Sequence, residues 1–532
     1  MALTDNVRRL DVNIAQGLAH AKKAFGTHQA VACGNTRYTW NDFEQRTDAL
    51  ARGLAALGIE RGDRVAVLML NCHRYLELYY ACARMGAVIV PLNIRLARPE
   101  IVFILNDSET KVLVVDKPFA PYATGRDTFP SVTHIVYCGE ETPPDMINYD
   151  DVMSKGTQMQ ESVDQVMEDD DIVGLFYTGG TTGRAKGVML SHKNIVSNAM
   201  NAIIAFGFNN QATWLHAAPM FHLADVGAIF GVTMLGARHA FIPMFNPVHV
   251  LQAIQDEKVT VTVLVPTMIN AVLNHPDVDT YDLSSLRCLI YGASPMPIQL
   301  LKQGLRKWGK IFAQGYGMTE TSPLLTVLDM HDHIVDGTPE QVRRLASCGK
   351  EIVGVEVRVV NAAGDDVEPG EIGEIIARGP NVMLGYWRLQ EATAAAIVDG
   401  WMHTSDLAMV DEENYIYSVD RAKDMIISGG ENVYSVEVEN ALYTHPAVLE
   451  AAVIGIPDDT WGEAVHAVVV CKPGMNANAE ELIAHARTQI AGYKVPRSIE
   501  FYPEALPKSG AGKILKRDLR TKYWADKGRN VN

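Results

Sequence analysis

The sequence predicts an α/β protein with a large N-terminal domain and a small C-terminal domain. From residue 40 to about 330, segments with helical periodicity alternate with short apolar runs, among them RVAVLML, KVLVVD and RCLIYG. This alternation is typical of crossover units, so we expect mainly parallel sheets covered by helices. From about Gly349, the segment VGVEVRVVNAAGDDVEPGEIGEIIARG alternates with a period of two between Gly, Asp and Pro turns. That pattern predicts a small antiparallel subdomain.

The last part of the chain reads as a separate compact unit. Its pattern runs strand, helix SVEVENALYTHP, strand LEAAVIGIP, strand VHAVVVCK and helix AEELIAHARTQIAG, followed by a Gly- and Lys-rich tail. The length of 532 residues also exceeds the ~250–300 residues at which a single core stops growing. We therefore place a boundary near Asp420, with an N-terminal domain at residues 1–420 and an α+β C-terminal domain at residues 421–532.

Composition narrows the classes of function. The net charge of −16 argues against general affinity for nucleic acid or for an anionic membrane. Seven scattered cysteines without a CxxC pair predict free thiols and a reducing compartment. The N-terminus has no apolar signal core, and the longest apolar stretch is about twelve residues, too short to span a bilayer. We expect a cytoplasmic protein that is not an integral membrane protein and does not bind nucleic acid.

A glycine-rich stretch, YTGGTTGRAKG at Tyr177–Gly187, follows an apolar run that predicts a buried strand. Glycines let backbone N–H groups approach a ligand closely, and the threonines and Lys186 add donors, so the stretch suits a chain of phosphates. It differs from the common phosphate loop because Ala185 precedes Lys186 and Gly187 follows it. The alternative interpretation is a flexible hairpin turn.

Two more glycine loops follow apolar runs: YGASPMP at Tyr291–Pro297 and QGYGMTETSP at Gln314–Pro323. Ligands of open parallel sheets bind beyond the carboxyl ends of the strands, so the three loops are expected to converge on one crevice. There Tyr316 would stack on a flat ring, Thr319 would donate to a phosphate and Glu320 would hold a magnesium ion. Plain turns and a solvated surface acid are the alternatives for these residues.

These loops, with HTSDLA, DRAKDMIISGGENVYSVEVE and LPKSGAGK, resemble the motifs of the adenylate-forming superfamily in their usual order, from about residue 35 to 520. This superfamily includes acyl- and aryl-CoA synthetases, peptide-synthetase adenylation domains and beetle luciferases, and the chain is most similar to fatty-acyl and coumarate-type CoA ligases. The resemblance implies a barrel-like antiparallel subdomain and a mobile C-terminal domain. It also implies a two-step reaction, in which a carboxylate attacks Mg·ATP to give an acyl-adenylate and coenzyme A then displaces AMP.

The resemblance implies roles for individual residues. Thr319, Glu320, His222 and Lys513 would be catalytic, with Glu320 as the metal ligand. The residues implied to bind ATP and AMP are Thr178, Gly179, Gly180, Thr181, Thr182, Gly183, Lys186, Gly292, Ala293, Ser294, Gln314, Gly315, Tyr316, Gly317, Thr319, Asp406, Arg421 and Lys513. The family usually has serine at Gly179 and proline at Ala185, so this chain has one hydroxyl fewer in that loop and a less restrained backbone.

The resemblance also implies that different residues of the C-terminal domain act in the two steps. Lys513, on a flexible loop, would reach the main-domain site during adenylation. Lys423 would be the hinge, and Gly429 and Gly430 would contact pantetheine after rotation. The alternatives are a solvated basic tail for Lys513 and a surface salt bridge from Arg421 to Asp420 or Asp424.

The segment PMFHLADVGAIF would line the acyl pocket, with His222 as a mobile gate near the carboxylate. Asp225 has an alternative role as the N-cap of the following helix. The pocket residues implied are His222, Asp225, Val226, Gly227, Gly292, Gly315, Gly317 and Met318. Small residues there indicate a deep pocket for a long or flat acid.

Several substrates stay open at this stage. A medium- or long-chain fatty acid is the first expectation, a phenylpropenoic acid of the coumarate or ferulate type is the second, and an amino acid loaded on a carrier protein is a third. A nucleotide-binding sensor without chemistry is the alternative from another class. The expected cofactors are ATP, Mg²⁺ and coenzyme A, and a homodimer is one expected assembly.

Overall fold

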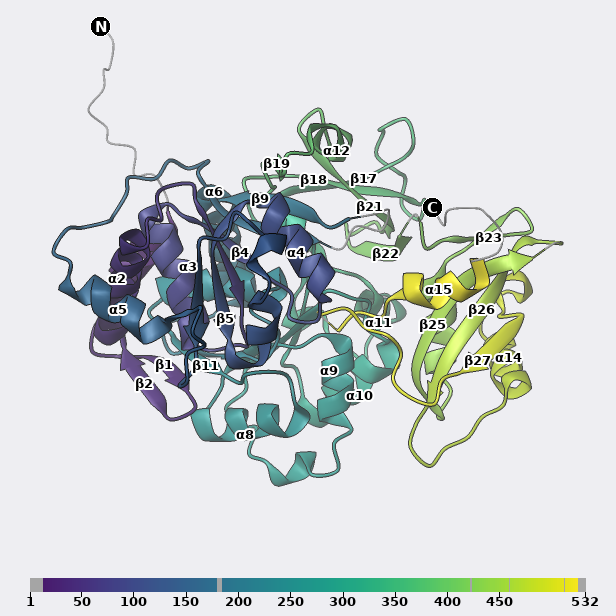
Figure 1. Ribbon diagram of the computed structural model, residues 1–532. Coiled ribbons are helices and arrows are strands. Elements are labelled where there is room, and N and C mark those ends of the chain that lie inside the picture. The colour runs from purple at the N-terminus through teal and green to yellow at the C-terminus, as the bar shows by residue number, and fades with distance from the viewer. Residues whose placement is uncertain (1–12, 179–183, 422, 459, 511, 525–532) are drawn as a thin grey trace, which may run out of the picture.

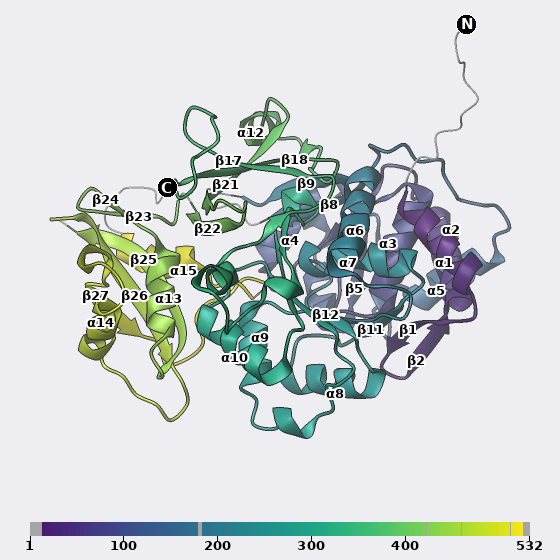
Figure 2. The ribbon, with the colours of Figure 1, turned by 180° about the vertical axis from the view of Figure 1, so that it is seen from behind.

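The computed structural model describes residues 13–178, 184–421, 423–458, 460–510 and 512–524. Figure 1 shows a large domain, coloured purple to green, with the small yellow-green C-terminal domain at one side, and Figure 2 shows the same arrangement from behind. The α/β fold class is as predicted. The predicted boundary at residue 420 falls near the end of a strand, β22 (Ile416–Arg421), and stays a prediction.

The first sheet of the large domain has a parallel centre with antiparallel pairings at both edges. From edge to edge it contains β16 (Lys350–Glu351), β15 (Thr326–Leu328), β14 (Phe312–Tyr316), β13 (Cys288–Gly292), β12 (Val261–Val263), β10 (Thr213–His216), β11 (Arg238–Phe241), β1 (Gln29–Cys33) and β2 (Thr36–Thr39). Two of the predicted glycine loops leave the ends of β13 and β14, which are neighbours in this sheet.

The second sheet is parallel except at one edge, where a hairpin pairs antiparallel. Its order is β19 (Gly385–Tyr386), β9 (Lys186–Ser191), β8 (Ile172–Thr178), β4 (Val88–Pro91), β3 (Arg64–Leu68), β5 (Thr110–Asp116), β6 (His134–Cys138) and β7 (Ile147–Asn148). The first glycine-rich stretch lies between β8 and β9, which pair antiparallel up to Thr178 and Lys186. Its interpretation as a phosphate loop stays a prediction.

The large domain contains twelve α-helices among its described residues, and several of them pack on these two sheets. The twelve helices are α1 (Ile14–Phe25), α2 (Trp40–Ala56), α3 (His73–Met85), α4 (Arg98–Asp107), α5 (Tyr149–Gln158), α6 (His192–Phe206), α7 (Leu223–Met234), α8 (Pro247–Glu257), α9 (Pro266–Leu273), α10 (Ile298–Trp308), α11 (Pro339–Arg343) and α12 (Gln390–Ala396). The largest core joins both sheets, because buried Val31 of β1 and Val65 of β3 belong to one cluster with Trp40, Leu76 and Ile229 from three helices.

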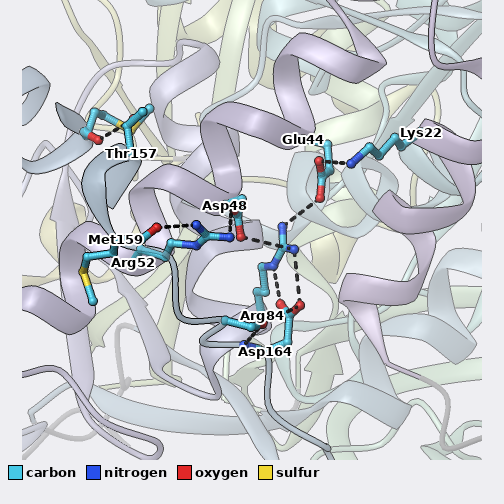
Figure 3. Close-up of polar contacts among 10 residues, drawn as sticks. Lys22, Glu44, Asp48, Arg52, Arg84, Thr157, Met159 and Asp164 are labelled. Atoms are coloured by element: carbon cyan, nitrogen blue, oxygen red, sulfur yellow. Dashed lines mark hydrogen bonds and ion pairs between the residues drawn. The ribbon is translucent and has the colours of Figure 1, made fainter. Parts of the chain in front are cut away.

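Polar contacts tie the helices of this core together at the surface, as Figure 3 shows. Arg84 of α3 pairs with Glu44 at 3.0 Å and with Asp48 at 3.3 Å, both on α2, and also pairs with Asp164. Arg52 of α2 donates to the carbonyl of Met159 at 2.6 Å. These contacts hold the segment after α5 against the helical layer.

The antiparallel subdomain follows β16. Its sheet has the order β17 (Glu356–Val360), β18 (Gly373–Arg378), β21 (Trp401–Val410) and β20 (Ile397–Val398), with β22 also paired to β21. The curled antiparallel sheet confirms the predicted subdomain. Because β22 ends at Arg421, the chain enters the C-terminal domain directly from this sheet.

The C-terminal domain is an α+β unit. Its sheet contains β24 (Glu431–Val433), β23 (Ile426–Ser428), β26 (Gly462–Cys471) and β25 (Val448–Asp458), with β27 (Ser498–Phe501) paired to β26. Its helices are α13 (Ser435–Tyr443), α14 (Ala479–Arg487) and α15 (Lys516–Trp524). Among the described residues of the whole chain, no helix is both long and apolar enough to cross a membrane.

Candidate active site

A cavity of about 660 Å³ lies where the ends of β13 and β14, the β8–β9 hairpin, α7 and the C-terminal lysine loop meet. Such a volume is within the usual range for ligand pockets. Of the residues that the sequence indicated, the cavity wall contains Thr178, Lys186, His222, Gly227, Gly292, Ala293, Gly315, Tyr316, Gly317, Met318, Thr319, Glu320, Arg421, Lys423 and Lys513. Residues from the three predicted loops are therefore brought together with Lys513, which lies far from them along the chain, at one site.

Other predicted site residues lie elsewhere. Outside the cavity wall are Asp225, Val226, Ser294, Gln314, Asp406, Gly429 and Gly430. The predicted phosphate contacts of Gly179, Gly180, Thr181, Thr182 and Gly183 fall on residues outside the described part of the chain.

The β8–β9 hairpin supplies a cation and a hydroxyl to the cavity. Thr178 at the end of β8 is paired with Lys186 at the start of β9, so both side chains flank the glycine-rich connection. Tyr177, next to Thr178, donates from its hydroxyl to the Asp107 carboxylate at 2.6 Å and anchors the base of the hairpin. The hairpin thus holds two donors at a fixed place on the wall.

A tyrosine, an aspartate and an arginine form one connected group at the predicted nucleoside side. The hydroxyl of Tyr316 donates to Asp406 Oδ2 at 2.9 Å, and Arg421 Nε lies 3.3 Å from Asp406 Oδ1. Asp406 accepts both contacts although it is not itself on the wall. Arg421 therefore pairs with Asp406, whereas the contact of Asp420 with Arg421 is made by the Arg421 backbone N–H at 2.8 Å.

Glu320 lies on a short 3₁₀ turn, η4 (Thr319–Thr321), directly after β14. It is 6% exposed, and its Oε1 accepts a 2.9 Å hydrogen bond from the hydroxyl of Tyr386. Burial raises the pKa of this carboxyl. A single buried carboxylate with one oxygen not bonded to Tyr386 fits a magnesium ion that arrives on ATP, because Mg²⁺ commonly binds one or two carboxylates together with substrate phosphates and water.

The loop that carries Lys513 is docked on the large domain. Arg95 Nη1 donates to the carbonyl of Ser509 at 2.8 Å, and Thr267 Oγ1 donates to the carbonyl of Gly512 at 3.1 Å. Within the loop, Ser509 Oγ accepts from the backbone N–H of Lys513 at 3.1 Å. Desolvation, reinforced by Arg421, lowers the pKa of Lys513 to about 8. A desolvated cation at this place favours an anionic ligand.

His222 lies at the start of α7 and lines the cavity. It is the N-cap of this helix, and its Nδ1 accepts from the backbone N–H of Ala224 at 3.2 Å. Desolvation lowers the pKa of His222 to about 4, so the ring is neutral at physiological pH. A neutral His222 ring near Lys513 is compatible with the predicted gate, because it can lie next to the carboxylate of the acid without adding charge.

The structure corrects the interpretation of Asp225 and Val226. Asp225 neither lines the cavity nor caps α7; it is buried, with its Oδ2 2.6 Å from His216 Nδ1 and its Oδ1 accepting from Trp214 Nε1 at 3.2 Å. Val226 is fully buried in the main core. Along a helix only residues three or four apart share a face, so these two neighbours point away while Gly227 and Ala228 reach the wall.

Sequence reasoning missed several wall residues. Phe206 of α6 and Trp214 of β10 line the apolar part of the cavity, and Tyr386 lines the part near Glu320. Phe206 is the last residue of α6 before Gly207, whose left-handed φ of 64° ends the helix. The apolar residues of α6 were visible in the sequence, but which of them face a cavity rather than a core depends on tertiary packing.

Comparisons with known proteins identify the family of this chain. Residues 18–387 match the AMP-binding enzyme family, and residues 437–513 match the AMP-binding enzyme C-terminal domain. A feruloyl-CoA synthase of an Amycolatopsis species is 42% identical over 93% of this chain and 96% of its own length. A fatty acid–[acyl-carrier-protein] ligase, ScoC, of Streptomyces coeruleorubidus is 35% identical over 95% of both chains. The crystal structure of the anthranilate CoA ligase AuaEII with anthranoyl-AMP superposes with a TM-score of 0.89 at 28% identity, covering 97% of this chain and 98% of that one.

The fold and the site define an adenylate-forming enzyme. The chain belongs to the AMP-binding enzyme family. Within it, the chain is an AMP-forming acid–thiol ligase that uses ATP and coenzyme A.

Proposed function

We propose that the acid activated by this ligase is a phenylpropenoate-type aromatic acid, of the ferulate class. The observation that carries this proposal is an aromatic wall at the apolar end of the cavity. Phe206 and Trp214 line the cavity. Phe208 is not on the wall but packs in the same hydrophobic cluster as these two residues. The Phe206 and Phe208 rings stack with centroids 6.2 Å apart, and Phe208 meets Trp214 edge-on at 5.8 Å.

This wall favours a short, flat acid for two reasons. Aromatic rings pack well against other rings, in stacked or edge-to-face geometry. The cavity of about 660 Å³ also has to hold the nucleotide, which leaves limited length for an extended chain. The relative of 42% identity is named a feruloyl-CoA synthase, which supports the same class.

The indole N–H of Trp214 is already bonded to Asp225. Trp214 therefore presents an apolar surface to the acid, and Asp225 fixes the orientation of that surface. In this account Asp225 affects the acyl pocket through Trp214 rather than by touching the substrate.

The first half-reaction uses the residues around the phosphates. The carboxylate of the acid attacks the α-phosphate of ATP, and negative charge grows on the phosphoryl oxygens as pyrophosphate leaves. Lys186 and Thr178 bind the outer phosphates, Thr319 donates near the α-phosphate, and Lys513 neutralises charge there. Glu320 would hold a magnesium ion, which would supply positive charge to the phosphate oxygens.

The second half-reaction requires the C-terminal domain to rotate. Gly429 and Gly430, which form the tight turn between β23 and β24 with φ of 64° and 85°, lie off the cavity wall in this structure. We place them next to pantetheine after rotation, with Lys423 near the hinge. The thiol of coenzyme A then attacks the acyl carbonyl and AMP leaves.

A fatty acid of medium chain length is the second candidate. The walls around Gly227, Ala228, Val263 and Leu324 are apolar, and one relative of 35% identity is named a fatty acid–[acyl-carrier-protein] ligase. The predicted homodimer and the cytoplasmic location stay predictions.

A panel of acids tests the proposal. Ferulate, coumarate, benzoate, octanoate, dodecanoate and phenylalanine would each be supplied with Mg·ATP and coenzyme A, and pyrophosphate release and thioester would both be measured. We expect kcat/KM for ferulate or coumarate to exceed that for the fatty acids by at least about tenfold, the scale at which pocket shape discriminates. Preference for octanoate or dodecanoate would overturn the aromatic assignment.

A further inference from the structure

Lys186 and Glu320 carry opposite charges on the wall of one cavity, and both contact Tyr386. The hydroxyl of Tyr386 donates to Glu320 Oε1 at 2.9 Å, and Lys186 Nζ lies 4.8 Å from the centroid of the Tyr386 ring. The Tyr386 hydroxyl therefore binds the Glu320 carboxylate, and the face of the Tyr386 ring contacts the Lys186 ammonium. Tyr386 lies outside the predicted motifs and has no part in the half-reactions proposed above.

The backbone fixes Tyr386 between the two elements that carry these charges. Tyr386 belongs to β19 and is paired with Val188 of β9, two residues after Lys186. Its neighbour Trp387 donates from the backbone to the carbonyl of Gly187 at 2.7 Å. On the other side, the backbone N–H of Met383 donates to the carbonyl of Glu320 at 2.8 Å.

Two opposite charges in a poorly solvated site attract each other strongly. If Lys186 and Glu320 paired directly, neither would be free for its ligand. The Tyr386 hydroxyl donates to Oε1 alone, and a carboxylate can accept several bonds, so Glu320 can still bind a cation while Tyr386 holds it. The ring offers Lys186 a contact that a phosphate can easily replace.

We propose that Tyr386 is a positioning residue that keeps Lys186 and Glu320 apart. Lys186 then stays available to bind phosphate, and Glu320 stays available to bind a divalent cation. This inference rests on the roles proposed above for Lys186 and Glu320 in binding Mg·ATP. It assigns the two roles to separable parts of one side chain, the hydroxyl for Glu320 and the ring for Lys186.

Two substitutions separate these parts. Tyr386→Phe keeps the ring and removes only the donor, so ATP affinity without metal stays within about twofold while the gain in affinity on adding Mg²⁺ falls about tenfold, the scale of one hydrogen bond to a charged group. Tyr386→Leu removes the ring as well, so it also weakens ATP binding without metal.

The chain offers a matched control outside the cavity. The Tyr415 hydroxyl donates to Asp332 Oδ1 at 2.9 Å, and Lys350 Nζ lies 4.4 Å from the Tyr415 ring centroid. Tyr415→Phe is therefore the same chemical change in the same kind of surroundings. It should leave the Mg²⁺ dependence of ATP binding unchanged.

The experiment is calorimetric titration of the full-length chain with ATP alone, without acid, in the presence and absence of Mg²⁺. Wild type, Tyr386→Phe, Tyr386→Leu, Tyr415→Phe and Glu320→Gln would be compared. The inference is supported if the increase in ATP affinity on adding Mg²⁺ is lost in Glu320→Gln and Tyr386→Phe but kept in Tyr415→Phe. If Glu320→Gln loses the gain and Tyr386→Phe keeps it, the inference is overturned and the proposed function stands. If Glu320→Gln also keeps the gain, the proposed role of Glu320 fails, and the inference fails with it.

Discussion

The hydroxyl of Thr267 on α9 donates to the carbonyl oxygen of Gly512 at 3.1 Å, which joins the large domain to the loop that carries Lys513. Arg95 makes a second contact of this kind to Ser509 at 2.8 Å. Both bonds end on backbone carbonyls of the lysine loop, and Lys513 lines the cavity. This is the arrangement that the proposed role of Lys513 in the first half-reaction requires.

Removing the Thr267 donor should slow that half-reaction selectively. Thr267→Val keeps the shape of the side chain and loses one hydrogen bond, so we expect adenylation to fall roughly two- to tenfold. Thioester formation from a supplied acyl-adenylate should not change, because it follows rotation away from this contact. Thr157→Val removes a 3.0 Å helix bond to Met153, away from the domain interface, and serves as the control. Equal effects of both variants on adenylation would contradict the docking role.

Lys513 and Gly430 should separate the two half-reactions. Lys513→Ala should reduce adenylation by 100-fold or more, a loss of roughly 3 kcal/mol in transition-state stabilisation, and largely spare thioester formation. Gly430→Asn adds bulk at a left-handed position that asparagine tolerates, with no heavy atom within 4 Å of the new Cβ, and should do the reverse. Pyrophosphate–ATP exchange reports the first step and thioester yield from a synthetic acyl-adenylate the second. The same defect in both variants would rule out alternation.

The pKa of Lys513 gives adenylation a pH limit. Desolvation lowers this pKa from 10.5 to about 8, and the protonated form is the one that neutralises phosphate. Adenylation kcat/KM should therefore fall as pH rises through about 8 rather than above 10. The Lys513→Arg variant, whose side chain stays protonated, should be slower but should not show this fall in kcat/KM, the alkaline limb of the pH profile. Lys423, whose pKa is also lowered to about 8, is the control, and Lys423→Gln should keep the limb. A limb that disappears in Lys423→Gln instead would contradict the assignment.

The depth of the acyl pocket is best tested at Ala228. A substitution of Gly317 would disturb the backbone as well as the pocket, since a Cβ there would lie 1.7 Å from the Pro323 carbonyl oxygen at a φ of 157°. Ala228→Leu adds volume on the cavity-facing side of α7, so kcat/KM should shift by about tenfold or more from ferulate toward benzoate. The melting temperature checks folding, and an unchanged ratio in a folded variant would place the acyl group elsewhere.

The sequence predicted the site where chemistry dictates residue type and could not predict it where packing decides. Glycine loops after strands and the antiparallel subdomain follow local patterns, whereas Lys513 was indicated by the resemblance to a family. The structure brings residues of the loops and Lys513 to one cavity. The partners of Asp225 could not be foreseen, because Trp214 and His216 lie on a strand whose distance from α7 depends on the whole sheet. Tyr386 was missed for the same reason, since its role depends on the pairing of β19 with β9 and on a contact across 66 residues of sequence.

The central claim is that this chain activates an aromatic acid as its adenylate with Lys513 docked at the cavity. Pyrophosphate–ATP exchange with ferulate, in the absence of coenzyme A, tests it most directly. The account predicts exchange that requires the acid and that is lost in Lys513→Ala. Exchange that is absent with ferulate and coumarate, or that persists unchanged in Lys513→Ala, would contradict it.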